Sequence, residues 1–246
     1  MSEAPALATR GLVAGYERDL PIVRGIDLTI GKGELVAILG PNGAGKSTYV
    51  KAIAGTVPCF GGAIMLDGKD ITAMPLHQRI SAGLAFVPQT ENIFASLSIG
   101  ENLQLAADVL PKALRAARLE KMWAMFPDLA SRPALRAGQL SGGQRQMLAV
   151  ARALIVEPQV LILDEPSAGL SPKIVSSVFA MLQSINRSGV TILLVEQNVK
   201  AALAIADRGV ILVEGQLRHE GNAAQLATDP LLAELYLGAQ PEKASA

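Results

Sequence analysis

The sequence predicts an α/β fold with a parallel-sheet core, an N-terminal antiparallel β subdomain and an inserted α-helical subdomain. Three observations support this prediction. The apolar runs GELVAILG, VLILDEP and VTILLVE are short enough to be buried strands, and the runs in the second half of the chain alternate with helical stretches. The first third is rich in short β runs, and residues 98–137 carry Ala, Leu, Arg and Met at helical spacing. Strand and helix in alternation are typical of a parallel, doubly wound sheet.

Length and composition exclude several classes of protein. The 246 residues suffice for one domain with a substantial core. No apolar run approaches the roughly 18 residues that span a bilayer, and the N-terminus MSEAPALATR is not typical of a secretory signal. Lys plus Arg and Asp plus Glu both number 22, so a net charge of zero gives no field that attracts nucleic acid. The single Cys59 excludes an internal disulfide and a cysteine-cluster metal site, as expected for a cytoplasmic protein.

The expected elements follow in order along the chain. LATRGLVAGY, DLTI and GELVAILG predict strands, a helix is expected from Lys46 to about Ala54, and AIMLDGKDI predicts two β runs that turn at Asp67-Gly68. IGENLQLAADVL and KALRAARLEKMWAMF predict the helices of the insertion. PKIVSSVFAMLQSINRSG and NVKAALAIAD predict further helices, RGVILVEGQLRHE predicts two strands, and LLAELYLG predicts a capping helix.

The strongest motif for chemistry is the stretch GPNGAGKST, which follows an apolar strand and precedes a helical run. It fits the pattern G-x-x-x-x-G-K-[ST], in which backbone N–H groups wrap the phosphates of a nucleotide. Lys46 would supply a point charge to the outer phosphates, and Ser47 would ligate Mg²⁺. The nine residues of this predicted nucleotide-binding loop are Gly40, Pro41, Asn42, Gly43, Ala44, Gly45, Lys46, Ser47 and Thr48.

A second motif, VLILDEP, delivers two adjacent carboxylates to the end of a buried strand. Open α/β sheets bind their ligands at the carboxyl ends of the strands. We therefore expect Asp164 to hold the Mg²⁺ shell and Glu165 to orient and polarise an attacking water. The same two residues could also form an ordinary turn. The presence of the phosphate loop in the same chain favours the catalytic interpretation.

A third motif, LSGGQ, is part of the polar turn LSGGQRQ that leads into the helical stretch QMLAVARALIVE. Glycines at a helix start favour an anion, because unpaired N–H groups and the positive end of the helix dipole converge there. Ser141 also suits the N-cap position of that helix. The chain thus carries two helix starts suited to phosphate, although one nucleotide needs only one.

The phosphate loop, Gln89 in FVPQT, LSGGQ and LILDEP together resemble the ATP-binding subunits of ABC transporters, in their order and spacing and over nearly the whole chain. This resemblance implies a phosphate-loop NTPase fold that binds ATP and Mg²⁺. It also implies that the second helix start contacts the γ-phosphate of ATP held by an opposing ATPase subunit. Each helix start would then serve a different nucleotide. The residues implied for this contact are Ser141, Gly142, Gly143 and Gln144.

The resemblance assigns further roles with weaker support. Tyr16 would stack on adenine, or it is an ordinary edge-strand tyrosine. Gln89 would meet Mg²⁺ and join the helical insertion to the core, or it is a solvated loop amide. Gln197 stands where the family usually has a catalytic histidine. It is either a competent substitute or the mark of a slower site beside a paralogous subunit that keeps its histidine. The loop that carries Ser167, Gly169 and Leu170 would contact the partner subunit.

A transport ATPase is favoured over two other classes of protein. The DNA-repair members of the family carry zinc cysteines or a long coiled coil, neither of which this sequence has. An ATP-binding protein without turnover is disfavoured by the intact set of Lys46, Asp164 and Glu165. DEPSAGLSP, LLVEQNV and ELYLG resemble the ATPase subunits of branched-chain amino acid importers, the LivF type, and the ATPases for urea and short-chain amides remain an alternative.

The implied assembly contains a second ABC ATPase subunit, either paralogous or identical, and two transmembrane permease subunits. A periplasmic or extracellular substrate-binding protein would act with it indirectly, and no nucleic acid is expected. The chain would lie on the cytoplasmic face of the bacterial inner membrane. We expect residues 1–246 to form a single ABC ATP-binding domain. Its expected parts are the core and β subdomain at about 1–97 and 138–220, the helical subdomain at about 98–137 and the C-terminal tail at about 221–246.

Overall fold

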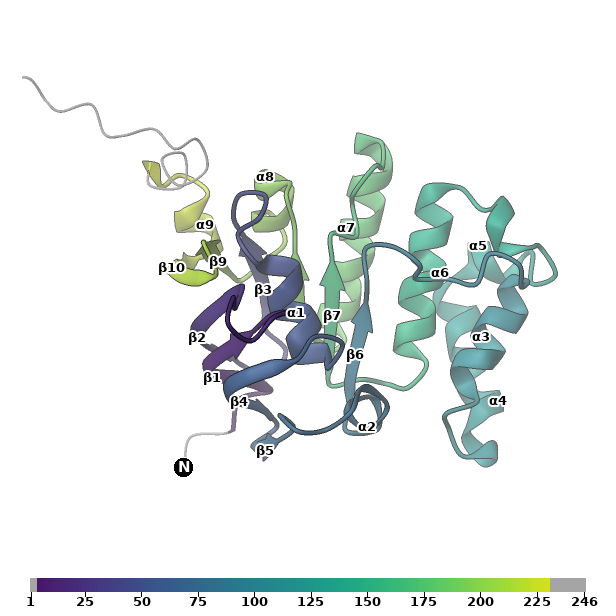
Figure 1. Cartoon of the computed structure of the whole chain (residues 1–246). Coiled ribbons are helices and arrows are strands. Elements are labelled where there is room, and N and C mark those ends of the chain that lie inside the picture. Colours follow the sequence, from purple (N-terminus) through teal and green to yellow (C-terminus); the bar gives the residue numbers. More distant parts are fainter. Residues whose placement is uncertain (1–3, 231–246) are drawn as a thin grey trace, which may run out of the picture.

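A six-stranded sheet forms the centre of the structure, a computed structural model that describes residues 4–230 (Figure 1). Its strand order is β10-β9-β3-β8-β7-β6. The five strands from β9 to β6 pair in parallel, and only β10 runs antiparallel, beside β9. The parallel core predicted from the sequence is confirmed. The strands are β3 Leu35–Leu39, β6 Leu84–Val87, β7 Val160–Asp164, β8 Thr191–Val195, β9 Arg208–Val213 and β10 Gln216–Asn222.

The N-terminal part forms a second, antiparallel sheet with the order β2-β1-β4-β5. Asp67 and Gly68 connect β4 to β5 with positive φ angles of 45° and 77°, as a tight hairpin turn requires. The expected hairpin and the expected antiparallel sheet are therefore both present. The strands are β1 Leu7–Ala14, β2 Val23–Ile30, β4 Cys59–Leu66 and β5 Lys69–Asp70.

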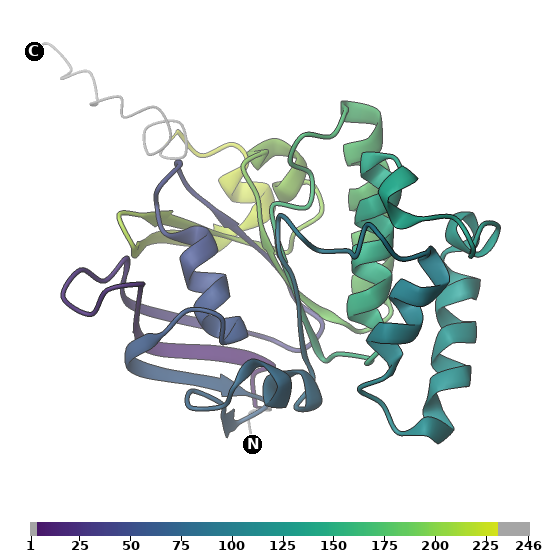
Figure 2. The ribbon, with the colours of Figure 1, turned by 45° about the vertical axis from the view of Figure 1, so that its right-hand side comes forward.

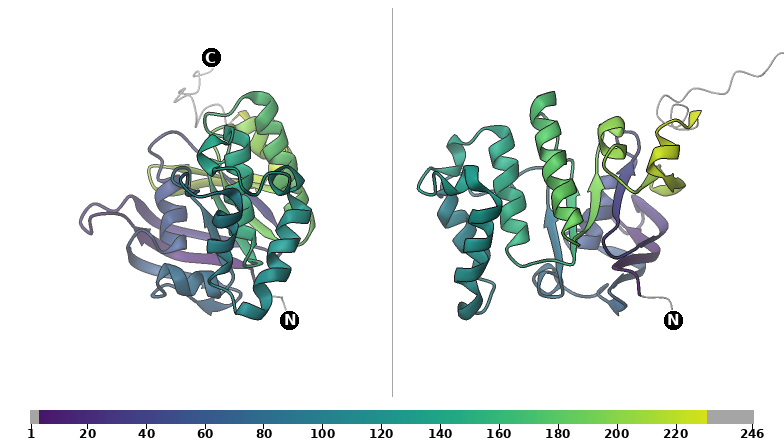
Figure 3. Two further views of the ribbon diagram at one scale, coloured as in Figure 1. Left: turned by 90° about the vertical axis from the view of Figure 1, so that its right-hand side faces the viewer. Right: turned by 180° about the vertical axis from the view of Figure 1, so that it is seen from behind.

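Helices cover both faces of the central sheet. Helix α1 lies between the two sheets, whereas α6, α7 and α8 lie on the opposite face and α3 and α4 lie outside α6 (Figures 2 and 3). The expected α1 boundaries are confirmed. The helices are α1 Lys46–Ala54, α2 Leu76–Ser81, α3 Ile99–Ala107, α4 Lys112–Met125, α5 Pro127–Ala130, α6 Gly142–Leu154, α7 Pro172–Arg187, α8 Val199–Leu203 and α9 Ala223–Leu226, with a 3₁₀ turn at Ala137–Gln139.

Alternate side chains of each parallel strand belong to different hydrophobic cores. In β3, Val36 and Ile38 pack with α1 and the antiparallel sheet, while Leu35, Ala37 and Leu39 pack with α6, α7 and the helical insertion. A strand buried on both faces needs apolar residues at every position. This requirement explains the unbroken apolar runs in the sequence.

Several elements differ from the expectations. Strand β6 was not predicted, because its run of four residues, LAFV, is too short to be distinguished from a loop. Helix α8 covers only Val199–Leu203 of the expected stretch NVKAALAIAD. The capping helix expected in LLAELYLG lies outside the described residues. No helix between residues 4 and 230 has the length and hydropathy needed to cross a membrane.

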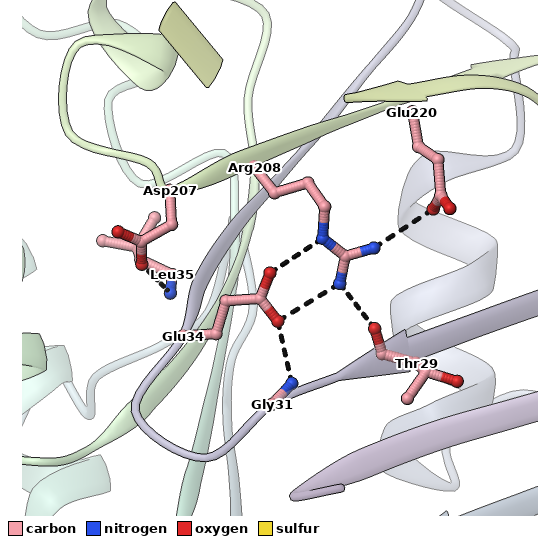
Figure 4. Close-up of polar contacts among 7 residues, drawn as sticks. All are labelled: Thr29, Gly31, Glu34, Leu35, Asp207, Arg208 and Glu220. Atoms are coloured by element: carbon pink, nitrogen blue, oxygen red, sulfur yellow. Dashed lines mark hydrogen bonds and ion pairs between the residues drawn. The ribbon is translucent and has the colours of Figure 1, made fainter. Parts of the chain in front are cut away.

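Arg208, at the start of β9, joins the two sheets (Figure 4). Its guanidinium donates to the carboxylate of Glu34 at 2.7 and 3.2 Å, to the carboxylate of Glu220 at 3.1 Å, and to the backbone oxygen of Thr29 in β2. The planar guanidinium has enough donors to serve all three acceptors. This cluster lies at the amino-terminal end of β3, so it leaves the carboxyl ends of the strands free for a site.

Candidate functional site

The polar residues singled out from the sequence gather at one edge of the central sheet, where the parallel strands end. The phosphate loop follows β3, Gln89 follows β6, Asp164 and Glu165 end β7, and Gln197 follows β8. These strands are neighbours in the order β3-β8-β7-β6. Parallel pairing therefore brings together side chains that are more than 100 residues apart in the sequence.

The phosphate loop encloses a cavity of about 210 Å³ lined by Ile22, Glu165 and residues 42–48. Gly40 has a φ of 148°, and a Cβ atom there would lie 2.1 Å from the backbone oxygen of Leu212, so only glycine fits this close approach to β9. Gly45 has a φ of 93° where the loop enters α1. Packing and backbone conformation thus require glycine at these two positions independently of any ligand.

Lys46 lies at the base of this loop. Its Nζ donates hydrogen bonds to the backbone oxygens of Gly40 at 2.7 Å and Pro41 at 3.0 Å. Burial lowers the pKa of Lys46, while the nearby carboxylates of Glu165 and Asp164 act in the opposite direction. A lysine ammonium directed into the loop is suited to the outer phosphates of a nucleotide.

Ser47 and Asp164 form a pair of oxygen donors beside the loop. The Ser47 hydroxyl donates to Oδ1 of Asp164 at 2.9 Å, although the two residues come from α1 and β7. Asp164 is only 1% exposed, and burial raises its pKa. A hydroxyl and a buried carboxylate suit a hard cation such as Mg²⁺, which uses few protein ligands together with substrate phosphates. The donor set therefore fits the magnesium expected from the sequence.

Glu165 is held from three sides. Its side chain accepts a hydrogen bond from Nε2 of Gln89 at 2.8 Å and two from Nε2 of Gln197 at 2.9 and 2.8 Å. Its backbone has a φ of 49°, an unfavourable conformation for a residue with a side chain, and its N–H donates to the backbone oxygen of Val195. The structure thus brings Gln89 and Gln197 together at the carboxylate that the sequence predicts to orient and polarise the attacking water.

The second helix start, at α6, lies apart from the phosphate-loop cavity. Ser141 caps the helix by accepting from the Gln144 N–H at 3.3 Å, and the Gln144 side chain accepts from the Ser141 N–H at 3.1 Å. None of these residues lines the loop cavity. Gly142 instead lines a neighbouring cavity together with Gln89 and Glu165, and no residue of the phosphate loop lines that cavity. Within one chain, the two helix starts therefore line different cavities.

The two glycines of LSGGQ have a packing role that the sequence did not reveal. A Cβ atom on Gly142 would lie 2.7 Å from Cδ2 of Leu170, and one on Gly143 would lie 2.5 Å from Cγ2 of Ile174. Glycine at both positions therefore lets α6 approach α7 and the loop that precedes it.

Tyr16 is a predicted site residue that lies outside the phosphate-loop cavity and, within residues 4–230, has no side-chain hydrogen bond to the other predicted site residues. It follows β1, the residue is 62% exposed, and it does not line the phosphate-loop cavity. Its stacking on adenine stays a prediction. Sequence reasoning also missed two residues at the site: Ile22, which lines the cavity, and Glu196, which is buried beside Gln197. The only signal for Glu196 is an acidic residue placed directly after an apolar strand.

Together, the fold and the site define an α/β nucleotide-binding domain with a phosphate loop and a carboxylate pair on a neighbouring strand. The profile of the ABC transporter family matches residues 23–168, more than half of the chain. The chain belongs to the ABC transporter family and is an ATP-hydrolysing transport ATPase.

Three relatives and one solved structure agree with this assignment. The chain is 42% identical to a probable branched-chain amino acid transport ATP-binding protein, LivF, of Archaeoglobus fulgidus, over 94% of this chain and 98% of that protein. It is 36% identical to the branched-chain amino acid transport protein BraG of Pseudomonas aeruginosa, over 92% and 97%. It is 34% identical to the lipopolysaccharide export protein LptB of Escherichia coli K12, over 94% and 97%. The ADP conformation of MJ1267, an ABC transporter cassette, superposes with a TM-score of 0.84 at 26% identity, over 97% and 100%.

The packing of Gly143 gives a test that does not depend on nucleotide. We expect Gly143→Ala to lower the free energy of unfolding by about 1–3 kcal/mol, because the added methyl group overpacks the α6–α7 contact. Ile174→Ala removes the opposing Cγ2, so Ile174→Ala should cost less in the Gly143→Ala background than in the wild type. Urea unfolding of the four proteins measures both effects. Equal costs of Ile174→Ala in the two backgrounds would contradict the packing role.

Proposed function

We propose that this chain is the ATPase subunit of an importer of branched-chain amino acids. One observation supports this substrate class. Over almost its full length, the chain is more similar in sequence to the branched-chain amino acid transport proteins than to the lipopolysaccharide export protein. An importer of urea or short-chain amides is the alternative that the sequence resemblance leaves open. A role on DNA is disfavoured by the net charge of zero.

In the proposed mechanism, each group of residues at the site has a separate role in ATP hydrolysis. The backbone of the phosphate loop and Lys46 bind the phosphates, and Ser47 and Asp164 hold Mg²⁺, with Gln89 as a further ligand through its amide oxygen. Bound Mg²⁺ neutralises charge on the phosphate oxygens. Glu165 orients the attacking water and draws its proton, since a carboxylate held by two amides is fixed in position.

The site is completed by a second ATPase subunit. Residues 141–144 lie outside the phosphate-loop cavity of their own chain, yet they present the N-terminus of α6, which suits an anion. We infer that Ser141, Gly142, Gly143 and Gln144 contact ATP held by the opposing subunit. ATP then joins two chains face to face, and its hydrolysis releases them.

An apolar groove next to Gln89 is our candidate for the contact with the permease. The groove measures about 500 Å³ and lies between the segment after β6, helix α3 and helix α6. Phe94, Leu105 and Val109 line it and are 46%, 44% and 64% exposed. The Arg152 guanidinium stacks 4.6 Å from the Phe94 ring centroid. Pro88 lines the groove and is followed by Gln89, whose amide donates to Glu165. A segment bound in the groove would therefore lie two contacts away from the carboxylate of Glu165.

The substrate class is tested by uptake. Cells that lack this chain should lose uptake of labelled leucine, isoleucine and valine, and plasmid-borne wild type should restore it, whereas Glu165→Gln should not. Unchanged leucine uptake together with lost uptake of urea or acetamide would refute the amino acid assignment and leave the ATPase assignment intact.

Nucleotide-driven pairing predicts the behaviour of two variants. Glu165→Gln should bind ATP and lose turnover by at least about 100-fold, because the amide cannot take the proton of the attacking water. It should therefore elute as a dimer with Mg·ATP in size-exclusion chromatography. Lys46→Ala should weaken ATP binding itself and stay monomeric when no other ATPase subunit is present. A Glu165→Gln variant that remains monomeric with every candidate partner subunit and Mg·ATP would rule out the two-chain site.

Docking in the groove is tested by a matched pair of leucines. Leu105 and Leu114 are both 44% exposed and both belong to the helical insertion, but only Leu105 lines the groove. Leu105→Asp should lower substrate uptake about tenfold or more and leave the ATPase activity of the isolated subunit unchanged. Leu114→Asp should affect neither. The groove is not the docking surface if the two variants transport equally well.

Gln197 is expected to act by positioning Glu165, because its amide donates two of the three side-chain hydrogen bonds that this carboxylate accepts. Gln197→Ala should lower the ATPase rate on the order of tenfold. Gln197→His should leave the rate unchanged or lower it, since neutral imidazole donates only one hydrogen bond. A clear rise in rate for Gln197→His, measured in the reconstituted transporter, would indicate instead a slower site beside a paralogous subunit with a histidine.

A further inference from the structure

Glu196 is a buried carboxylate that the proposed mechanism does not use. It follows β8 directly and is only 1% exposed. Burial raises its pKa, and hydrogen bonds from Ser167 act against this shift. No lysine, arginine or histidine among residues 4–230 forms an ion pair with it. A carboxylate in such a place is costly unless hydrogen bonds hold it.

Two loops supply those hydrogen bonds. Oε1 accepts from the Ser167 N–H at 3.0 Å, and Oε2 accepts from the Ser167 hydroxyl at 2.8 Å and the Gln197 N–H at 3.2 Å. The backbone N–H of Glu196 donates to the oxygen of Ile38 in β3, which anchors the residue to the sheet. Glu196 thus connects the loop after Glu165 to the turn that carries Gln197.

The connection closes a ring around the catalytic carboxylate. Ser167 lies two residues after Glu165, and its hydroxyl and N–H bind Glu196. The next residue in the chain, Gln197, reaches back with its side-chain amide to the carboxylate of Glu165. A shift of the Ser167 loop therefore acts on Gln197 through Glu196.

We propose that Glu196 is a positioning residue that fixes the Gln197 amide against Glu165 and couples it to the loop of Ser167. This inference rests on the proposed role of Glu165 in hydrolysis. The loop of Ser167 also carries Gly169 and Leu170, which the family resemblance places against the partner subunit. Glu196 thereby links the contact with the partner to the geometry of the catalytic carboxylate.

Glu196→Gln is the informative variant because it keeps the size of the side chain. The amide has one oxygen where the carboxylate has two. In either orientation its NH₂ group faces a backbone N–H, that of Ser167 or that of Gln197, so at least one of these donors loses its acceptor. Glu34→Gln is the control, because Glu34 is another hydrogen-bonded carboxylate with little exposure but lies with Arg208 at the far end of β3.

Hydrogen exchange on the full chain tests the contact without nucleotide or transport. In Glu196→Gln, the amide of Ser167 or of Gln197 should exchange about tenfold faster or more, while amides of β7 and β8 keep their protection. Glu34→Gln should leave both loops unchanged. Unchanged exchange at Ser167 and Gln197 in Glu196→Gln would overturn the proposal.

A double-mutant cycle tests the positioning role. Glu196→Gln should lower kcat for ATP about tenfold with little change in ATP binding, and the same change should have little effect in a Gln197→Ala background. Losses that multiply would show that Glu196 does not act through Gln197, and would overturn the proposal. If Glu196→Gln fails to fold, Ser167→Ala replaces it in the same cycle, with the same dependence on Gln197 expected. The hydrogen-exchange experiment needs no turnover. Its result therefore distinguishes a failure of this inference from a failure of the transport or ATPase assignment.

Discussion

Parallel pairing of β3, β8, β7 and β6 is the constraint on which the rest of the structure depends. Parallel strands end at the same edge of a sheet. The loops that follow the carboxyl ends of these strands therefore lie side by side at that edge. Four such loops bring the phosphate loop, Gln89, the carboxylate pair and Gln197 together. Two hydrophobic cores, one on each face, hold these strands in register, while the cluster of Arg208 and Glu34 fixes the opposite end of β3.

Glu165 is the point at which these loops meet. Two amides from the segments that follow β6 and β8 hold its carboxylate, and its own backbone adopts a φ of 49° that the neighbouring contacts must stabilise. Gln89 lies beside the apolar groove, and Gln197 is joined through Glu196 to the loop of Ser167. In our account, the carboxylate of Glu165 is therefore connected both to the groove proposed to bind the permease and to the loop proposed to contact the partner ATPase subunit.

The sequence predicted the parts of the site that depend on local spacing. The phosphate loop, the Asp164–Glu165 pair and the capped start of α6 are short motifs, and their chemistry follows from residues within a few positions of one another. The parallel core was predicted for the same reason, because strands buried on both faces leave unbroken apolar runs. Contacts between distant segments were not predictable. The approach of Gly143 to Ile174, the bond from Ser167 to Glu196 and the cluster around Arg208 each depend on packing between elements that no local pattern specifies. Strand β6 was missed because four residues carry too little periodicity.

The central claim is that the helix start of α6 contacts ATP held by the opposing subunit. A photoreactive group on the γ-phosphate of an ATP analogue tests it most directly. The chain carrying Lys46→Ala, which is not expected to hold the analogue itself, is mixed with its partner ATPase subunit, and the labelled peptides are mapped by mass spectrometry. If the helix start of α6 contacts this ATP, label is expected on Ser141, Gly142, Gly143 or Gln144 of the Lys46→Ala chain. Label confined to the chain that binds the analogue through its own phosphate loop would contradict the two-chain site.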